Sequence, residues 1–368
     1  MTDFAFKLIN WYKENKRDLP WRNTKDPYFI WLSEIILQQT RVAQGMPYYL
    51  RFLEAFPTIQ SMAEADEQEI LRLWQGLGYY SRARNMHQSA KIIIQNLNGI
   101  FPDSYAKILA LKGVGNYTAA AIASFAFNED VAVVDGNVFR VLARLFGVEE
   151  DIASGKGQKV FQQLADELLP KGESATYNQA IMEFGATFCK PISPDCNACI
   201  FNDRCVAFVQ KRQQELPLKI KKLKIKERTF TYLIFNYQGK LVMKMRGAGD
   251  IWQGLYDFPT FEDIIADEEV LKGSNIKNSL SMLLEDRNLL QMKVGQQILD
   301  KEMTLLSVSH TYKHLLTHQK ISAQFIHFQI NNKELALVLA EGLDLKFYTI
   351  TEIHDLPKPI LIANYLEI

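Results

Sequence analysis

The four cysteines of this 368-residue chain all lie within seventeen positions, at the spacing C-x6-C-x2-C-x5-C: Cys189, Cys196, Cys199 and Cys205. Four thiolates gathered in one loop-rich segment can surround a tetrahedral metal centre. Two local disulfides are the alternative, but disulfide frameworks are typical of short secreted proteins. Zinc sites usually contain two close cysteine pairs, whereas this array has one close pair and two wider gaps. The spacing therefore favours a [4Fe–4S] cluster over zinc.

Two carboxylates could perform acid–base chemistry. Glu34 stands among large apolar residues in WLSEIILQQTRV (31–42), where burial disfavours the ionised form and raises the pKa, as a general acid at neutral pH requires. Asp135 follows the apolar run 131–134 and precedes an amphipathic helix, so it could face a pocket or be an ordinary helix N-cap. Two carboxylates in unlike surroundings are the usual apparatus for cleaving a glycosidic bond.

The segment LALKGVGNYTAAAIASFAF (109–127) indicates contact with DNA. Gly113 and Gly115 end one helix and begin the next, which exposes backbone N–H groups where a phosphate can bind. This helix–hairpin–helix arrangement binds the DNA backbone without reading sequence. An ordinary turn between helices uses glycine in the same way. The flanking Lys112 and Tyr117 favour the DNA-binding interpretation.

The elements that must position these residues change in kind along the chain. Strand-like sequence begins at residue 229: a β-hairpin over 229–246 turns at Gln238-Gly239, 321–330 is a further strand, and 278–290 reads as a helix between them. Before that point, apolar residues recur at three- and four-residue spacing and predict helices at 4–12, 29–42, 46–55, 67–75, 83–97, 104–111, 117–126, 137–146, 158–168 and 174–188.

The expected fold class is therefore multidomain, an all-α domain followed by an α+β domain. We place the helical domain at 1–209, a basic linker at 210–228 and the α+β domain at 229–368. Within the helical domain, a six-helix core would span about 22–133, and a cluster lobe would combine 1–21 with 134–209.

The composition of the chain bears on nucleic-acid binding and on its location in the cell. Lys plus Arg and Asp plus Glu both number 42, so net charge carries no signature of nucleic-acid binding and the argument must be local. The segment 211–228 holds eight Lys or Arg against two Glu and could be a solvated linker or a strap that contacts phosphate. The N-terminus lacks the apolar stretch of a signal peptide, and no run suits a membrane span. We expect a cytoplasmic, nucleoid-associated protein.

Several of these motifs occur in an order that resembles the endonuclease III superfamily of base-excision DNA glycosylases, specifically its adenine DNA glycosylase (MutY-type) branch. Lyases of that superfamily carry a Schiff-base lysine two residues beyond the G-V-G turn, where this chain has Tyr117. The segment IWQGLYDFP (251–259) resembles the Nudix-like module that the branch uses to recognise 8-oxoguanine. The remaining matching segments are LPWR (19–22), SEIILQQTRV (33–42), LKGVGNYTA (111–119), VVDGN (133–137) and the cysteine array.

The resemblance implies roles for residues of the helical domain. Glu34 would protonate adenine and make it a leaving group, and Asp135 would stabilise the oxocarbenium-like sugar, directly or through a transient covalent adduct. Tyr117 and Asn137 would line the same pocket. Arg17, Trp21, Arg22 and Glu183 match positions around the flipped adenine. Gln39 and Tyr79 match residues that wedge into the duplex, and Arg82 and Arg84 suit phosphate contact or a solvated helix start.

In the C-terminal module, the family's loop for 8-oxoguanine commonly reads H-x-F-S-H. HLLTH (314–318) gives Leu316, Thr317 and His318 at the F-S-H positions; HTYKH (310–314) is a second frame and gives Tyr312, Lys313 and His314. We prefer the first frame because Thr317 keeps a hydroxyl. Nothing in residues 261–300 fits the G-x5-E-x7-R-E-x-x-E-E pattern with which a Nudix hydrolase holds Mg²⁺, so this module is expected to bind rather than hydrolyse.

The leading hypothesis is a monomeric, monofunctional glycosylase that acts on double-stranded DNA and removes adenine mispaired with 8-oxoguanine or guanine. A glycosylase/lyase for oxidised pyrimidines is the alternative enzyme, with Lys112 as its nearest amine. A module that only grips the DNA backbone is the non-enzymatic alternative, and it would have no use for a buried Glu34.

Overall fold

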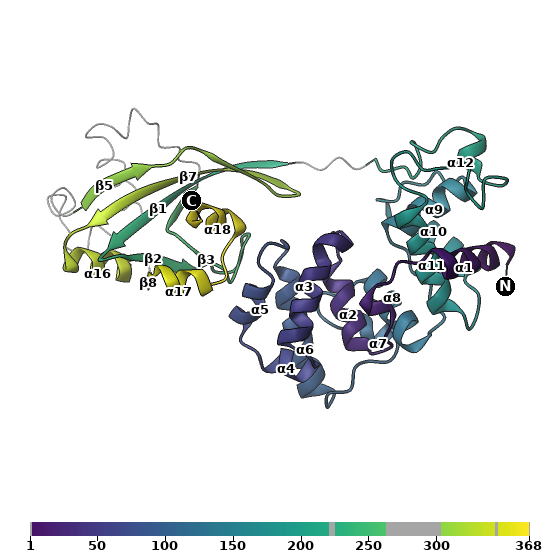
Figure 1. The fold of residues 1–368 in the computed structure, drawn as a ribbon, viewed down its shortest axis with the longest axis horizontal. Coiled ribbons are helices and arrows are strands. Elements are labelled where there is room, and N and C mark those ends of the chain that lie inside the picture. The colour runs from purple at the N-terminus through teal and green to yellow at the C-terminus, as the bar shows by residue number, and fades with distance from the viewer. Residues whose placement is uncertain (1, 221–224, 263–302, 343–344, 368) are drawn as a thin grey trace. The chain divides into compact units, whose positions relative to one another are not determined.

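The computed structural model describes residues 2–220, 225–262, 303–342 and 345–367. The chain divides into two compact units, one formed by 1–65 with 81–222 and the other by 66–80 with 223–368 (Figure 1). The helix expected at 278–290 lies outside the described residues. Among the described helices, none combines the length and the apolar character needed to cross a membrane.

The first unit is helical, as predicted. A 3-10 turn at Pro20–Arg22 and the short helices α4 and α12 were not expected from the sequence. The helices of this unit are α1 (Asp3–Asn15), α2 (Pro27–Ile36), α3 (Val42–Ala55), α4 (Ile59–Glu64), α6 (Ser81–Asn96), α7 (Tyr105–Leu109), α8 (Asn116–Phe127), α9 (Gly136–Phe146), α10 (Gly155–Leu168), α11 (Ser174–Thr187) and α12 (Val206–Val209).

The predicted helix 29–42 is wrong beyond Ile36, where α2 ends. The guanidinium of Arg82 reaches the end of this helix, and its Nη1 donates to the carbonyls of Ile35 at 2.9 Å and Gln38 at 2.7 Å. These bonds satisfy carbonyls that a helix end leaves without intrahelical partners. The chain then turns through Gln39, an exposed residue in the left-handed region at φ +54°. The break in α2 is therefore what brings Gln39 to the surface.

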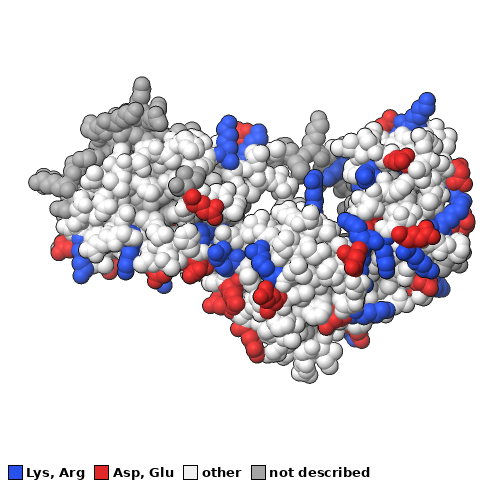
Figure 2. Space-filling view, in the orientation of Figure 1, with Lys and Arg blue, Asp and Glu red and all other residues white. Residues whose placement is uncertain are grey.

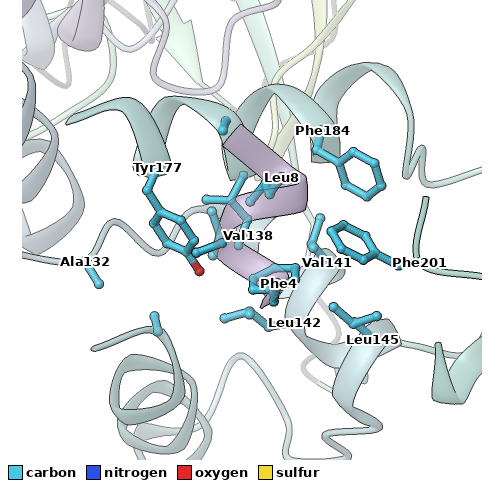
Figure 3. Packing of buried hydrophobic residues seen from close by; sticks show 14 of the residues in the cluster. Phe4, Leu8, Ala132, Val138, Val141, Leu142, Leu145, Tyr177, Phe184 and Phe201 are labelled. Atoms are coloured by element: carbon cyan, nitrogen blue, oxygen red, sulfur yellow. The ribbon is translucent and has the colours of Figure 1, made fainter. Parts of the chain in front are cut away.

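One hydrophobic core of the first unit joins segments that are distant in sequence (Figure 3). Leu8 of α1 packs in it with Val141 of α9 and Phe184 of α11. Trp11 meets Phe184 edge-on at 5.0 Å between ring centroids. This core fastens the N-terminal helix to α9, α10 and α11, the elements on either side of the pocket and the cysteine loop. Three of the four cysteines, Cys189, Cys199 and Cys205, pack against it.

The second unit is built on a mixed sheet in the order β3-β2-β1-β7-β5, with β1 and β7 parallel. The predicted hairpin and the strand at 321–330 are confirmed, as β1–β2 and as part of β7. The strands are β1 (Lys226–Tyr237), β2 (Lys240–Met245), β3 (Tyr256–Asp257), β4 (Thr260–Glu262), β5 (Met303–Val308), β6 (Tyr312–Leu315), β7 (Gln319–Ile330) and β8 (Lys346–Thr349), and the helices are α5 (Glu67–Leu73), α16 (Lys333–Gly342), α17 (Ile350–Asp355) and α18 (Ile360–Leu366).

The basic segment 211–228 does not end as a solvated linker. Strand β1 already begins at Lys226, and the side chain of Arg228 is only 5% exposed. Arg228 pairs there with Asp250 and Glu262, whose carboxylates offset the cost of burying its charge. The last residues of the segment therefore belong to the sheet.

Candidate active site

A cavity of about 170 Å³ lies within the first unit. Its walls come from the segment before α2, from α2 itself, from the start of α8, from the turn before α9 and from α11. All eight residues that the sequence assigned to catalysis or to the adenine pocket line it: Arg17, Trp21, Arg22, Glu34, Tyr117, Asp135, Asn137 and Glu183.

Glu34 is buried on α2, with 6% of its surface exposed. Its Oε2 accepts a hydrogen bond of 2.7 Å from the Tyr117 hydroxyl. Burial raises the pKa of Glu34 to about 7, although the bond from Tyr117 lowers it in part. A carboxyl with this pKa holds its proton on a large share of molecules at neutral pH, which suits a general acid.

Asp135 is the N-cap of α9 and also faces the cavity, so both interpretations of its sequence position hold. Its Oδ1 accepts from the backbone N–H groups of Asn137 and Val138, each at 2.8 Å, and its Oδ2 accepts from Asn137 Nδ2 at 2.8 Å. Burial raises the pKa of Asp135, while these hydrogen bonds oppose the rise. The three bonds fix the direction of the carboxylate at a helix N-terminus, where negative charge is favoured.

Glu183 of α11 carries the opposite electrostatic character. It is 1% exposed, and its carboxylate accepts from Arg17 Nε at 2.7 Å and from Arg22 Nη2 at 2.6 Å. Burial alone would raise the pKa of Glu183, but the two guanidinium groups outweigh it and lower the pKa to about 2. The cavity thus holds one carboxylate that stays ionised and one carboxyl, Glu34, that titrates near neutrality.

Helices α9 and α11 approach closely beside Asp135. A Cβ atom on Gly185 would lie 2.7 Å from the Cβ of Asn137 and 2.9 Å from its carbonyl oxygen, so this approach requires glycine. Arg140 connects the N-terminus of α9 with the cysteine loop through two hydrogen bonds. Its Nη2 donates to Asn137 Oδ1 at 2.8 Å, and its Nε donates to the carbonyl of Cys189 at 2.8 Å.

The four cysteines line a second, smaller cavity in the first unit. Arg144, which is 3% exposed, closes one side of it and donates to the carbonyls of Lys190 at 2.7 Å and Pro191 at 3.1 Å. Burial raises the pKa of Cys199 to about 11, so thiolates need a nearby positive centre to persist at neutral pH. As they stand, no three His, Cys, Asp or Glu side chains of the described residues form a group that could hold a metal ion, so the case for a metal at this cavity rests on donor type. A cavity lined by four sulfur donors fits a soft metal centre by donor type.

The helix–hairpin–helix turn has the expected form. Gly113 is in the left-handed region at φ +76°, and a Cβ there would lie 2.7 Å from the Cβ of Asn85. Gly115 is the N-cap of α8 and makes no side-chain capping bond, which leaves the first backbone N–H groups of that helix without a side-chain partner. On the face shown in Figure 2, Lys and Arg are interspersed with Asp and Glu, in keeping with the zero net charge of the chain.

The two arginines expected at phosphates differ in their surroundings. Arg82 is 9% exposed and donates to the carbonyls at the end of α2, and its contact with phosphate stays a prediction. Arg84 is half-buried. Gln39 and Tyr79, the expected wedge residues, both have left-handed backbones, at φ +54° and φ +49°, and both are exposed. Such a conformation is uncommon for residues other than glycine and marks them as candidates for function.

In the second unit, Leu316, Thr317 and His318 form the turn between β6 and β7, and we call these three residues the recognition loop. Thr317 and His318 are exposed, and the Tyr79 hydroxyl donates to Thr317 Oγ1. The second frame lies inside β6, where the ring of Tyr312 meets the rings of Phe325 and Tyr365 edge-on.

Two polar residues in or beside the cavity, Gln179 and Arg140, were not expected from the sequence. Gln179 lines the cavity and accepts a 2.5 Å hydrogen bond from the Tyr12 hydroxyl. It stands one helical turn before Glu183, so the three- and four-residue spacing of α11 could have identified it. Arg140 carried no such signal, because its role depends on the packing of α9 against α11 and the cysteine loop.

Two family models match this chain. The HhH-GPD superfamily base excision DNA repair protein model matches residues 32–171, and the NUDIX domain model matches 230–367. The adenine DNA glycosylase of Buchnera aphidicola subsp. Acyrthosiphon pisum is 36% identical over 266 residues, which cover 72% of this chain and 76% of the relative. The adenine DNA glycosylase of the subspecies Baizongia pistaciae is 38% identical over 265 residues, 71% and 75% of the two chains.

A solved structure of a thermostable thymine-DNA glycosylase superposes with a TM-score of 0.51 at 30% identity, over 56% of this chain and 95% of that one. The helical unit thus has the fold of a base-excision glycosylase, and a Nudix-like α+β unit follows it. The chain belongs to the adenine DNA glycosylase family, the base-excision repair enzymes that act on adenine in DNA.

Proposed function

We propose that this protein hydrolyses the N-glycosidic bond of adenine mispaired with 8-oxoguanine or guanine and leaves the DNA strand intact. The hydrogen bond between Tyr117 and Glu34, in a cavity that Asp135 also lines, carries the proposal. The target bond lies inside a base stack, so the adenine must be turned out of the duplex to reach such a cavity. We also propose that it acts as a monomer on the double-stranded DNA of the nucleoid.

In this mechanism the two carboxyl groups have separate tasks. Glu34, with a pKa near 7, donates a proton to the adenine ring and makes the base a neutral leaving group. Positive charge then develops on the sugar, and the Asp135 carboxylate, fixed by its three hydrogen bonds, stabilises it until water attacks. Glu183, Arg17 and Arg22 line the same cavity and can hold the polar edge of the base.

Tyr117 supports monofunctional chemistry. A lyase needs an amine that can form an imine with the sugar. The phenol of Tyr117 cannot do so, and burial raises its pKa well above its usual value of 10. Of the described residues that line the cavity, none is a lysine.

The recognition loop supports selection of the base opposite adenine. Thr317 and His318 present a hydroxyl and an imidazole at an exposed turn, and both groups can donate and accept hydrogen bonds. The contact from Tyr79 joins this loop to an expected wedge residue. Both observations favour the first frame, in which Thr317 and His318 contact 8-oxoguanine.

We further propose that Cys189, Cys196, Cys199 and Cys205 hold a [4Fe–4S] cluster. The four thiolates would ligate the cluster, which when bound supplies the covalent cross-links that hold the loop in shape. Arg144 orients two carbonyls of that loop and so acts on its backbone. A broad absorbance near ~400 nm in the purified protein, lost in Cys199→Ser, would support iron–sulfur ligation, and a colourless protein that contains zinc would refute it.

The test of the function uses duplexes with adenine opposite 8-oxoguanine, guanine or thymine. We expect release of free adenine from the first two, strand breaks only after alkali, and no borohydride-trapped adduct of the kind that an imine gives. Release from the thymine pair at the same rate would contradict mispair selectivity. Strand cleavage without alkali, together with borohydride trapping, would contradict the monofunctional mechanism.

A further inference from the structure

The recognition loop is fastened at both of its ends. At its C-terminal end, the backbone N–H of Lys226 donates to the carbonyl of His318 at 2.9 Å. Arg228 Nη1 donates to Oε1 of Gln319, the next residue, at 3.2 Å. At the N-terminal end, the ring of His314 lies against the ring of Trp252, with 5.9 Å between centroids. Two side chains from elsewhere in the unit, Arg228 and Trp252, therefore meet the residues that flank the loop.

Several contacts fix the position of the Arg228 side chain. Its guanidinium is buried and forms paired bonds with Asp250, both at 2.7 Å, and with Glu262, at 2.6 and 2.7 Å. The same group lies 4.7 Å from the ring centre of Phe230. Planar, two-pronged contacts of this kind restrict a guanidinium far more than a single ion pair does. Gln319 therefore bonds to a donor that has little freedom to move.

Trp252 is held in an unusual conformation. It is 8% exposed and has a left-handed backbone at φ +63°, which is strained for a bulky residue. The guanidinium of Arg246 lies 5.9 Å from its ring centre. Arg246 Nη2 also donates to Asp250 at 3.0 Å. Asp250 bonds to Arg228 as well, so the residues that meet the two ends of the loop, Arg228 and Trp252, belong to one network.

We propose that Arg228 and Trp252 are positioning residues that set the geometry of the recognition loop, and with it the preference for 8-oxoguanine over guanine opposite adenine. The inference rests on the proposed role of that loop. The two bases differ only at N7 and C8, where 8-oxoguanine carries an N–H donor and a carbonyl acceptor. Hydrogen bonds can distinguish such neighbouring groups only when the loop is held within about 0.5 Å of the productive geometry.

The experiment compares single-turnover adenine release from duplexes with adenine opposite 8-oxoguanine and opposite guanine, and its readout is the ratio of the two rates. We expect Trp252→Ala and Arg228→Lys to lower this ratio about tenfold or more, with little change on the guanine pair. Trp252→Phe, which keeps an aromatic ring, should retain most of the ratio. His314→Ala removes the loop side of the same contact without touching the buried network, and it should lower the ratio as Trp252→Ala does.

A matched control is Phe328→Ala, which weakens the same unit from the opposite face of the sheet, in the core with Leu335 and Leu339. It should leave the ratio unchanged, and a fall equal to that of Trp252→Ala would overturn the positioning role. Thr317→Ala with His318→Ala tests the underlying function. If this double variant keeps the full ratio, the proposed role of the loop is wrong. If it loses the ratio while Trp252→Ala, Arg228→Lys and His314→Ala retain it, the loop keeps its role and the positioning inference is overturned.

Discussion

The Tyr117 hydroxyl donates to Glu34 Oε2 at 2.7 Å and so joins the start of α8 to the last turn of α2. This bond stabilises the ionised form of a carboxyl that burial pushes toward the neutral form. Burial and the Tyr117 bond are the two largest and opposing influences on the pKa of Glu34, and the second of them can be removed by changing one side chain.

Tyr117→Phe should raise the pKa of Glu34 above about 7, because burial then acts without the opposing hydrogen bond. In the proposed mechanism protonated Glu34 is the active form, so the rate of adenine excision by the unaltered protein should fall as pH rises through about 7. In Tyr117→Phe the fall should move to higher pH. Single-turnover rates between about pH 5 and about pH 9 measure this. An unmoved or acid-shifted fall would contradict the assignment.

Glu34→Gln should stabilise the protein at alkaline pH. The pKa of Glu34 rises from 4.5 to about 7 on folding, so its contribution to stability is complete below pH 4.5 and is lost as pH rises through about 7. A neutral glutamine has no such loss, so above pH 7 the free energy of unfolding of Glu34→Gln should gain roughly 3 kcal/mol relative to that of the unaltered protein. Free energies of unfolding from denaturant titrations at about pH 4 and about pH 8 check this. If the free energies of unfolding of the variant and the unaltered protein differ by the same amount at both pH values, burial does not raise the pKa of Glu34.

Arg140→Gln should slow adenine excision by roughly tenfold to a hundredfold, a range typical when a supporting hydrogen bond to a site is lost. The change removes the bonds from Arg140 to Asn137 and to the carbonyl of Cys189. Binding to an uncleavable duplex should change much less, because the DNA-contacting turn is untouched. Lys156→Gln, at an exposed lysine of α10, is the control for loss of a positive charge. If Arg140→Gln weakens duplex binding as much as it slows excision, the variant has lost structure in general and the specific role of Arg140 is contradicted.

Gly185→Ala should reduce excision because the added methyl group meets the backbone of Asn137 and displaces the N-terminus of α9, where Asp135 is held. Gly155→Ala is the matched control, since a Cβ on that helical glycine meets nothing within 4 Å. Single-turnover rates on the same duplex, with unfolding midpoints of both variants, separate the outcomes. If Gly185→Ala is as active as Gly155→Ala, the close approach does not position Asp135.

The parts of the site carried by short segments could be predicted from the sequence. The neighbours of Asp135 left its role open, whereas the apolar neighbours of Glu34 predict its burial and the spacing of the four cysteines favours a metal centre. The same holds for most helices, whose apolar spacing is a local property. That Asp135 would be an N-cap and a pocket residue at once could not be decided locally, because the second role depends on α2 and α11.

What escaped prediction depends on contacts between distant segments. The end of α2 at Ile36 follows from the reach of Arg82 across 47 positions, and the sequence pattern continued the helix past that point. Arg140 reads as an ordinary helical arginine until α9 is packed against α11. Likewise, the basic run before the sheet gives no hint that Arg228 meets Asp250 and Glu262.

The most direct test of Glu34 as the general acid compares two proteins, the unaltered protein and Glu34→Gln. It measures how fast each releases adenine from an adenine:8-oxoguanine duplex under single-turnover conditions. Glutamine keeps the size of the side chain and can still accept the bond from Tyr117, but it cannot deliver a proton. We predict release by the unaltered protein, and a rate lower by about a hundredfold or more in Glu34→Gln with duplex binding retained. A near-normal rate in Glu34→Gln would contradict the role of Glu34 as the general acid.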